Sequence, residues 1–393
     1  MKHVLARLTR LRYARHAQSS PFSATKRYRR SIVPVFITRT SMTKVDEFRT
    51  VFESALRDID ARTAPGDDSS KRCLILSGGV DTCAILEASS RLGIKFSGAF
   101  TVITGDESPD KGFAMAAAKQ HGLDHTIIRL TPKELVDTYL PVCVELLECY
   151  DGMTLRNSLV VAAAFKAASE KGFTEAVVGD GADELFGGYS FMWGWPDDPA
   201  KWKEKRDSMC RKWTFATSTL GQNYGITPHS PYMEAKTVEW ALANTDRQDC
   251  IDDRPIRLVH GGEFKNHTTG KVILREAYET VSSWRRKDPI EVGSGVTVIG
   301  HDPYWKDIVS DEEFEKERKE LLERGFDVKS KEYLVNFRAF EKCFGANGEA
   351  CTKMKRLGLG EGCVGCCFDV GEELFCRMCG SYPAQRSMQE KKG

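Results

Sequence analysis

The stretch from Leu74 to Thr82 constrains the fold of this chain most strongly. An apolar run, Cys73 to Leu76, is typical of a strand buried in a parallel sheet, and it leads directly into Ser77-Gly78-Gly79. An amphipathic helix is expected next, ending at Gly93. Adjacent glycines allow a tight turn whose N–H groups approach a ligand, and the helix N-terminus adds partial positive charge. The pattern predicts a phosphate or pyrophosphate pocket; a tight turn without a ligand is the alternative.

The rest of the first half alternates between strand and helix patterns. Strands are expected at about 96–102, 126–130 and 175–178, and helices at 45–60, 109–121, from 132 with an interruption near Pro141, and 158–171. Such alternation is typical of a parallel, doubly wound sheet covered by helices on both faces. The pattern turns helical and aromatic from about Tyr189. The predicted fold class is therefore α/β, with a helical extension and a small Cys-rich C-terminal unit.

A second loop rich in glycine and acidic residues follows the strand expected at 175–178. It runs Gly179-Asp180-Gly181-Ala182-Asp183-Glu184, with three carboxylates within five positions. Carboxylate oxygens are ligands that suit Mg²⁺, and glycines let a nucleotide approach the backbone. Ligands of parallel sheets bind beyond the carboxyl ends of the strands, so both loops are expected to face one pocket. An ordinary polar loop is the alternative.

The first loop resembles the Ser-Gly-Gly-x-Asp-Ser/Thr loop of the N-type ATP pyrophosphatases. Together, the two loops resemble the synthetase domain of glutamine-dependent asparagine synthetase and its relatives. The resemblance covers about residues 45–300. Further landmarks occur in the same order: Ser108-Pro109-Asp110, His125, Pro231-Tyr232-Met233-Glu234, Lys271-Val272-Ile273-Leu274-Arg275, Trp284-Arg285-Arg286-Lys287 and Gly293-Ser294-Gly295.

The resemblance implies functional residues. The implied ATP-binding positions are Leu76, Ser77, Gly78, Gly79, Asp81, Thr82, Val102 and Gly179. Asp81 and Asp183 would position Mg²⁺. Asp180 stands where the family has an acid that acts on the incoming amine, and Lys287 would neutralise charge on the transferring groups. Arg275 completes the implied catalytic group.

The activity implied by the resemblance is that of an ATP-dependent carbon–nitrogen ligase. A substrate carboxylate, or alternatively a carbonyl, would attack the α-phosphate through its oxygen and release pyrophosphate, and an amine would then displace AMP. The chain departs from the family at its start, where Lys2 rather than a nucleophilic Cys follows Met1. Glutaminase activity is therefore not expected, and nitrogen would come from ammonia, a separate ammonia-supplying subunit or an amine substrate. Glu234 and Asp180 also depart from frequent family residues, so the small-molecule acceptor stays open.

Two Cys-x-x-Cys pairs lie near the C-terminus. Cys363 and Cys366 form the first Cys pair, and Cys376 and Cys379 form the second. This spacing is typical of a tetrahedral Cys₄ site in a zinc ribbon, so structural Zn²⁺ is the favoured interpretation. An iron–sulfur cluster, redox or sulfur-relay cysteines, and unliganded thiols are alternatives.

Charge is distributed unevenly along the chain. Residues 1–44 contain eleven Lys or Arg and no Asp or Glu, which leaves 46 basic against 56 acidic residues in the remainder. A basic, acid-free N-terminus is typical of a mitochondrial or plastid presequence. A disordered basic arm, or translation from Met42 with a cytoplasmic protein, is the alternative. The acidic remainder argues against a nucleic-acid partner, and no apolar run is long enough for a transmembrane helix.

The predicted organisation has four parts. They are a presequence (1–44), an ATP pyrophosphatase domain (45–300), a helical linker (301–342) and a Cys-rich tail (343–393). Two other functions compete with the ligase hypothesis. Some tRNA-thiolating enzymes combine a Ser-Gly-Gly-x-Asp-Ser loop with Cys-x-x-Cys pairs, so ATP-dependent sulfur transfer to tRNA is one. A non-catalytic nucleotide-binding assembly protein is the other.

Overall fold

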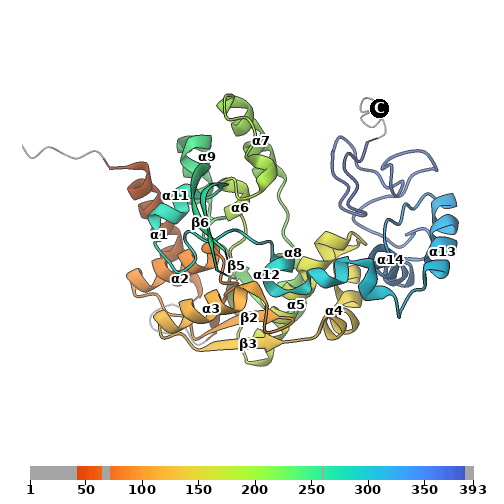
Figure 1. Cartoon of the computed structure of the whole chain (residues 1–393), viewed down its shortest axis with the longest axis horizontal. Helices are drawn as coiled ribbons and strands as arrows, with labels where there is room; N and C mark the ends of the chain where they lie inside the picture. Colours follow the sequence, from red (N-terminus) through yellow and green to blue (C-terminus); the bar gives the residue numbers. More distant parts are fainter. Residues whose placement is uncertain (1–41, 64–70, 259–260, 386–393) are drawn as a thin grey trace, which may run out of the picture. The chain divides into compact units, whose positions relative to one another are not determined.

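A central parallel sheet organises the fold of this computed structural model, which describes residues 42–63, 71–258 and 261–385 (Figure 1). The predicted presequence lies outside the described residues, apart from its last three positions. In spatial order, the strands are β3 (His125–Arg129), β2 (Gly98–Ile103), β1 (Arg72–Ile75), β4 (Glu175–Val177) and β5 (Thr227–His229). All neighbours pair in parallel, so the predicted α/β fold with a parallel sheet is confirmed.

The strand order places the two glycine–acid loops beside each other. The chain moves outward from β1 through β2 to β3, and then returns to the other side of β1 with β4 and β5. The direction of winding therefore reverses between β1 and β4. Sheets of this kind bind ligands at that switch point, beyond the carboxyl ends of the strands. Residues 77–82 follow β1 and residues 179–184 follow β4, so both predicted loops lie there.

Helices cover both faces of the sheet, and their boundaries mostly follow the predictions. Helix α4 continues through Pro141, where an interruption was expected, and α5 begins earlier than predicted because Asp151 caps it, accepting a hydrogen bond from Thr154 N at 2.9 Å. The helices are α1 (Lys44–Thr63), α2 (Val80–Leu92), α3 (Pro109–Gln120), α4 (Pro132–Leu147), α5 (Gly152–Glu170), α6 (Ala182–Leu185), η1 (Ser190–Met192), α7 (Pro199–Lys212), α8 (Ala216–Tyr224), α9 (Ala235–Asn244), α10 (Arg247–Cys250), α11 (Val272–Ala277), α12 (Ile290–Ser294), η2 (Val296–Gly300), η3 (Asp302–Trp305), α13 (Asp311–Glu323) and α14 (Lys331–Phe344).

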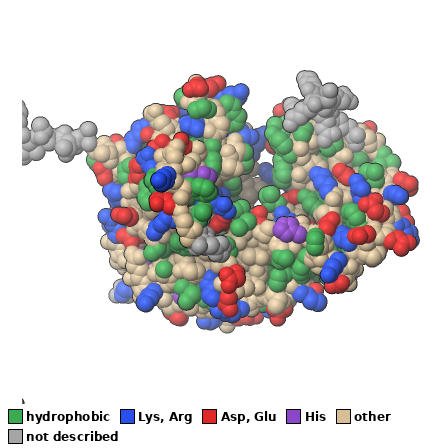
Figure 2. Space-filling model, viewed as in Figure 1, with side chains coloured by type: hydrophobic (Ala, Val, Ile, Leu, Met, Phe, Trp, Pro, Cys, Tyr) green, Lys and Arg blue, Asp and Glu red, His purple; other side chains and the backbone are tan. Residues whose placement is uncertain are grey.

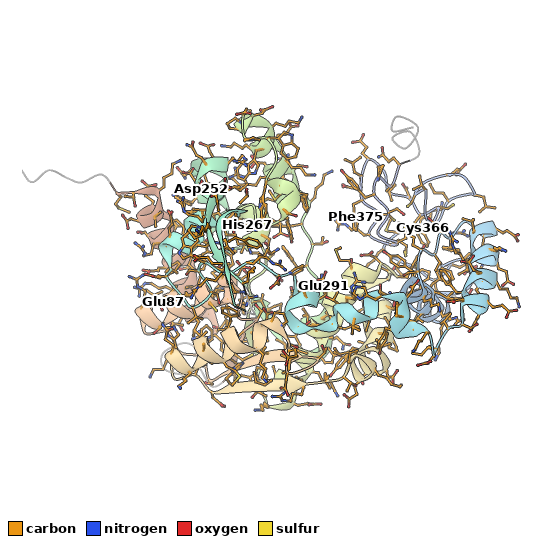
Figure 3. The ribbon with its side chains drawn as sticks, in the orientation of Figure 1. Glu87, Asp252, His267, Glu291, Cys366 and Phe375 are labelled. Atoms are coloured by element: carbon orange, nitrogen blue, oxygen red, sulfur yellow. The ribbon has the colours of Figure 1, made fainter. Side chains whose placement is uncertain are left out.

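Three strands were not predicted. Strand β5 spans only three residues and contains Pro228, which suits the edge of a sheet but gives no apolar signal. A separate antiparallel hairpin is formed by β6 (Asp252–Arg257) and β7 (Glu263–Thr269). Both of its strands are rich in polar and charged residues, so the sequence carries no alternation of apolar side chains. Asp252 and His267 mark the two strands in Figure 3.

Two apolar clusters form the core, one on each face of the sheet. Successive residues of β1 point to opposite faces, so Cys73 joins one cluster and Leu74 joins the other. The Cys73 cluster includes side chains from α4, α5, α8 and α14 and extends to the Cys pairs. The Leu74 cluster includes side chains from α1, α2, α3 and α11, and the fully buried Trp202. The Cys-rich tail therefore shares a core with one face of the sheet.

The described surface carries charges of both signs. Lys and Arg side chains are interspersed with Asp and Glu on the face shown in Figure 2. Within the described residues, no helix combines the length and the apolar character that crossing a membrane requires.

Candidate active site

The first loop has a backbone shape that only glycine can supply. Gly78 has φ +73°, and a Cβ at this position would lie 2.7 Å from both Ala114 N and Asp110 O. The next residue, Gly79, precedes α2 and donates its N–H to Ser77 Oγ at 3.2 Å. The loop is thus folded tightly at the N-terminus of a helix, as predicted, with the positive end of the helix dipole directed at it.

The second loop lies directly against the first. A Cβ on Gly179 would approach Asp81 Cβ to 3.1 Å and Thr82 Cγ2 to 3.3 Å, so the small residue permits the contact. Tyr232 Oη, from the segment after β5, donates to Asp81 O at 2.9 Å. The structure therefore brings together the two loops that the sequence predicted to share one pocket.

A buried lysine joins the carboxylates of the two loops. Lys271 Nζ lies 2.8 Å and 2.6 Å from the two carboxylate oxygens of Asp81, and 2.8 Å from Asp183 Oδ1. Lys287 Nζ approaches the same Asp183 oxygen at 2.8 Å. Only 1% of the Lys271 side chain is exposed, so this ammonium lies in a low-dielectric environment where its attraction to the carboxylates is strong.

Two glycines make room for this lysine. A Cβ on Gly188 would collide with Asp183 Oδ1 and with Lys271 Cε, and a Cβ on Gly270 would collide with Gly187 O. Lys271 itself has φ +61°, an uncommon conformation for a residue with a side chain. The surrounding backbone therefore holds Lys271 in a strained position in order to place its ammonium between the loops.

The pKa values of the two carboxyls diverge. Burial would raise the pKa of Asp183, but the ammonium groups of Lys271 and Lys287 outweigh it and lower the pKa to about 2. Burial raises the pKa of Asp81 above its ordinary value, and the attraction of Lys271 offsets this only in part. Asp183 is therefore the more firmly ionised member of the pair. Both contact the ammonium of Lys271, so the two loops share one cation.

Asp180 occupies a different environment from these two carboxyls. Thr217 Oγ1 donates to Asp180 Oδ2 at 2.5 Å, and Ser230 Oγ donates to Asp180 O at 2.6 Å. Burial raises the pKa of Asp180 to about 6, and the negative charges of Asp81 and Asp183 act in the same direction. A carboxyl with this pKa can exchange a proton near neutral pH, which is what a general base requires.

A neighbouring carboxyl was not predicted as a site residue. Glu184 accepts a hydrogen bond from Tyr189 Oη at 2.7 Å, and burial raises its pKa to about 7. The Tyr189 ring lies 4.4 Å below the ammonium of Lys287. This ring therefore connects Glu184 to the lysine that contacts Asp183.

Arg275 binds backbone carbonyl groups on both sides of α11. Its guanidinium donates to the carbonyl oxygens of Gly270, Ser283 and Arg285 at 2.8, 2.5 and 3.3 Å. Burial lowers the pKa of Arg275 to about 10, and only 2% of the residue is exposed. These bonds fix the chain on both sides of α11, so the geometry favours a positioning role for Arg275.

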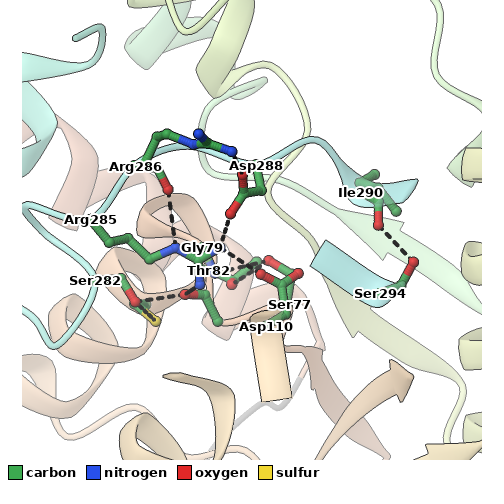
Figure 4. Close-up of polar contacts among 12 residues, drawn as sticks. Ser77, Gly79, Thr82, Asp110, Ser282, Arg285, Arg286, Asp288, Ile290 and Ser294 are labelled. Carbon is green, nitrogen blue, oxygen red and sulfur yellow. Dashed lines mark hydrogen bonds and ion pairs between the residues drawn. The ribbon is translucent and has the colours of Figure 1, made fainter. Parts of the chain in front are cut away.

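The segment after α11 closes over the first loop (Figure 4). Ser282 Oγ and Arg285 Nη1 donate to Gly78 O at 2.6 and 3.2 Å. Arg285 Nη2 also lies 2.6 Å from Asp110 Oδ1, and its guanidinium stacks over the Phe113 ring at 4.4 Å. Burial raises the pKa of Asp110 to about 6, against the attraction of Arg285. Asp110 and Arg285 belong to motifs seen in the sequence, but no local pattern indicated that they pair.

Leu76 and Val102, two of the implied ATP-binding residues, have buried side chains. Leu76 N donates to Phe100 O at 2.9 Å, and Leu76 O accepts a hydrogen bond from Thr101 Oγ1. The Leu76 backbone is therefore engaged with β2, and its side chain packs in the core. Any contact of Leu76 with an adenine ring would come from the edge of its backbone.

The four predicted cysteines come together in one cluster. The Sγ atoms of Cys363, Cys366, Cys376 and Cys379 all lie within 4.8 Å of one another, and all four residues are buried. Cys366 marks the position of this cluster in Figure 3. Four thiolates at this spacing match the donor set and compactness of a tetrahedral metal site. Cys367 points elsewhere, with Sγ 3.7 Å from Gly325 O.

Replacing Lys271 by Met should lower the free energy of unfolding by about 3 kcal/mol at pH 7, because two carboxylates lose a shared buried cation. The deficit should narrow as the pH falls from the ordinary carboxyl pKa of 3.8 towards about 2, where Asp183 becomes protonated in the wild type as well. Urea denaturation at several pH values measures this. Exposed Lys265→Met on β7 is the control, and an equal loss in both variants would contradict the assignment.

Residues 67–222 match the family model of asparagine synthase. The chain is similar to a probable glutamine-hydrolysing asparagine synthetase of Dictyostelium discoideum, at 27% identity over 229 residues covering 53% of this chain and 38% of the relative. It is also similar to the glutamine-hydrolysing asparagine synthetase B of Escherichia coli K12, at 26% identity over 203 residues covering 49% of this chain and 33% of the relative. The chain thus spans little more than a third of these relatives.

One solved structure also aligns with the chain. It is described as a predicted subunit of tRNA methyltransferase from Methanocaldococcus jannaschii, and the alignment covers 52% of this chain and 84% of that one. Sequence identity is 15% and the TM-score is 0.25, a similarity too low to carry a conclusion. The family match, in contrast, contains both glycine–acid loops with Asp81, Asp180 and Asp183. Residues 67–222 of this chain are therefore similar to the asparagine synthase family over the segment that holds both loops.

Proposed function

We propose that this protein is an ATP-dependent ligase that activates a carboxylate as its adenylate and transfers nitrogen to it. The observation that carries the proposal is the shared cation position between Asp81 and Asp183, at the switch point of the sheet. The similarity to the asparagine synthase family supports the same class of reaction. The proposed products, AMP and pyrophosphate, follow from the resemblance of the first loop to ATP pyrophosphatases.

The first loop would bind the phosphates of ATP. Its backbone N–H groups and the N-terminus of α2 supply positive potential without a mobile side chain. Asp81 and Asp183 would hold Mg²⁺, which neutralises negative charge on the phosphates. Lys271 and Lys287 would stabilise the negative charge that develops on the leaving pyrophosphate, because Lys271 contacts both carboxylates and Lys287 contacts Asp183.

Asp180 would serve the second half of the reaction. A carboxylate oxygen of the substrate first bonds to the α-phosphorus as pyrophosphate departs. The amine nitrogen then bonds to the acyl carbon, and AMP departs with the electron pair of the broken C–O bond. The amine must lose a proton in this step, and Asp180 can accept it because its pKa is raised to about 6.

The acceptor is proposed to be a small-molecule carboxylate, with nitrogen from ammonia, an amine substrate or a separate ammonia-supplying subunit. Activity with ammonium salts would indicate the first source. Activity that appears only with an added amine or a partner fraction would indicate one of the others.

The Cys cluster is proposed to hold a structural Zn²⁺ ion. Its four side chains are buried, so they are poorly placed to pass sulfur to a large substrate such as tRNA. The cluster ties together the described residues after α14, which form turns and isolated bridges. A metal ion would replace the core that such a small segment lacks.

The full-length protein with Mg-ATP, ammonium and a panel of carboxylates should release equal amounts of pyrophosphate and AMP. Asp81→Asn should lower this rate at least about 100-fold, because the variant loses charge at the proposed Mg²⁺ site. Asp137→Asn, at an exposed position on α4, should leave the rate unchanged. Release of ADP and phosphate, or sulfur transfer to co-purified tRNA, would refute the ligase proposal.

The pH dependence should report Asp180. A base must be ionised, so the rate of amide formation should rise with pH through about 6 and fall about tenfold per unit below it. Thr217→Val removes a donor that lowers the pKa of Asp180, so the acid limb should move to higher pH. If the acidic limb of the pH–rate profile stays at the same pH in this variant, the ionisation belongs to another group.

Metal analysis should find about one zinc per chain, the amount expected for a single Cys₄ site. Cys376→Ser should remove most of the zinc and lower the midpoint of thermal unfolding. Cys343→Ser is the matched control, because Cys343 is exposed and lies outside the cluster. Iron with visible absorption would replace the zinc assignment by an iron–sulfur cluster.

A further inference from the structure

The second Cys pair places an arginine against the segment that joins α7 to α8. Arg377 lies between the two cysteines of this pair. It donates from Nη1 to Thr214 Oγ1 at 2.8 Å and from Nη2 to Lys212 O at 2.7 Å. These acceptors flank Trp213 in the sequence. One planar guanidinium therefore holds both ends of the turn that carries the Trp213 ring.

The same segment packs against the turn formed by Asp180 and Gly181. A Cβ on Gly181, the residue after Asp180, would lie 3.3 Å from the Trp213 ring. Four residues after Trp213, buried Thr217 donates its hydroxyl hydrogen to Asp180 Oδ2 at 2.5 Å. The position of residues 213–217 thus determines whether Asp180 keeps its hydrogen-bond donor.

The backbone around Arg377 is fixed by the Cys cluster. Gly380 N donates to Cys376 O at 2.8 Å, which closes the turn that carries Arg377. Tyr150 N donates to Met378 O at 2.9 Å, which joins this turn to the start of the α5 region. The direction of the Arg377 side chain therefore depends on the shape of the second Cys pair.

A second contact between the same segments is weaker. Lys212 Nζ lies 2.9 Å from Glu373 Oε1, but the two side chains are 50% and 46% exposed. Exposed ion pairs of two flexible side chains contribute little to stability. Arg377 is exposed too, but its bonds go to a backbone carbonyl and a hydroxyl in a fixed two-pronged geometry. The link therefore depends mainly on Arg377, and Glu373 offers a matched control.

We propose that Arg377 is a positioning residue that links the Cys cluster to Asp180 by holding residues 212–217 against the Asp180–Gly181 turn. The positioning of residues 212–217 is argued from hydrogen bonds alone and does not depend on the proposed function. Its catalytic consequence rests on the proposed role of Asp180, so the two parts are tested by separate measurements.

Hydrogen–deuterium exchange on the full-length, metal-loaded protein tests the positioning. Amides of residues 213–220 should exchange about five- to tenfold faster in Arg377→Gln, since two charge-assisted bonds are lost. Exchange in Glu373→Gln should match the wild type, and the metal content of both variants should stay unchanged. Wild-type exchange in Arg377→Gln with its metal retained would overturn the proposal.

Chelation tests the dependence on the Cys cluster. Removing the metal should accelerate exchange of residues 213–220 in the wild type, but add little in Arg377→Gln, where the link is already broken. Equal acceleration in both proteins would show that the cluster acts on this segment by another route. Arg377→Lys should restore only part of the protection, because one ammonium does not reproduce the guanidinium fork.

The catalytic part is tested with the pyrophosphate assay and amide formation. Arg377→Gln should lower kcat and leave the KM for ATP unchanged. The acidic limb of the pH–rate profile for amide formation should move to higher pH, as in Thr217→Val. The double variant should be no worse than Thr217→Val, because Arg377 is proposed to act on Asp180 through Thr217. Asp81 and Asp183, the charges that face Asp180, are unaltered in all three variants. Faster amide exchange of residues 213–220, combined with an unchanged acidic limb of the pH–rate profile, would refute the link to Asp180. If the wild type releases no pyrophosphate, the proposed function fails while exchange still decides the positioning.

Discussion

The ion cluster of Lys271, Asp81 and Asp183 is the interaction on which the site depends. Two carboxylates at neighbouring strand ends repel each other, and their partial burial makes each charge costly. Lys271 comes from a segment 190 residues after Asp81 and neutralises both. The glycines at 188 and 270 and the left-handed backbone of Lys271 all serve this approach. Backbone strain and close backbone packing are thus found at the residues that hold one ammonium between the two loops.

Charge balance explains why such a cluster suits a phosphate reaction. The charges of Asp81 and Asp183 are matched by those of Lys271 and Lys287, so these four side chains together are close to neutral. A nucleotide brings several negative charges and a divalent cation brings positive ones. In the proposed reaction, the lysines would exchange carboxylate partners for phosphate oxygens without a large change in net charge. Groups that are already oriented lose little energy to reorganisation during the reaction.

The sequence predicted the parts of the site that are local. The two loops and their strands are continuous patterns, and the four cysteines are recognised by spacing, so β1, β4 and the cluster were predicted correctly. The pairings that complete the site are not local. Lys271 and Arg285 meet their partners only through the path of the chain after β5, a three-residue strand containing proline. The β6–β7 hairpin escaped prediction for the related reason that its polar strands lack an apolar periodicity.

The Cys-rich tail is joined to the parallel sheet by packing as well as by hydrogen bonds. Residues 345–385 are too few and too irregular to bury a core of their own, so they share the cluster that covers one sheet face. Asp151 shows how close this contact is, because it caps α5 while a Cβ on Gly380 would collide with its carboxylate. Because α5 packs on β2 and β3, the second Cys pair contacts a helix that itself lies against the sheet. The tail is therefore part of the structure that positions the site.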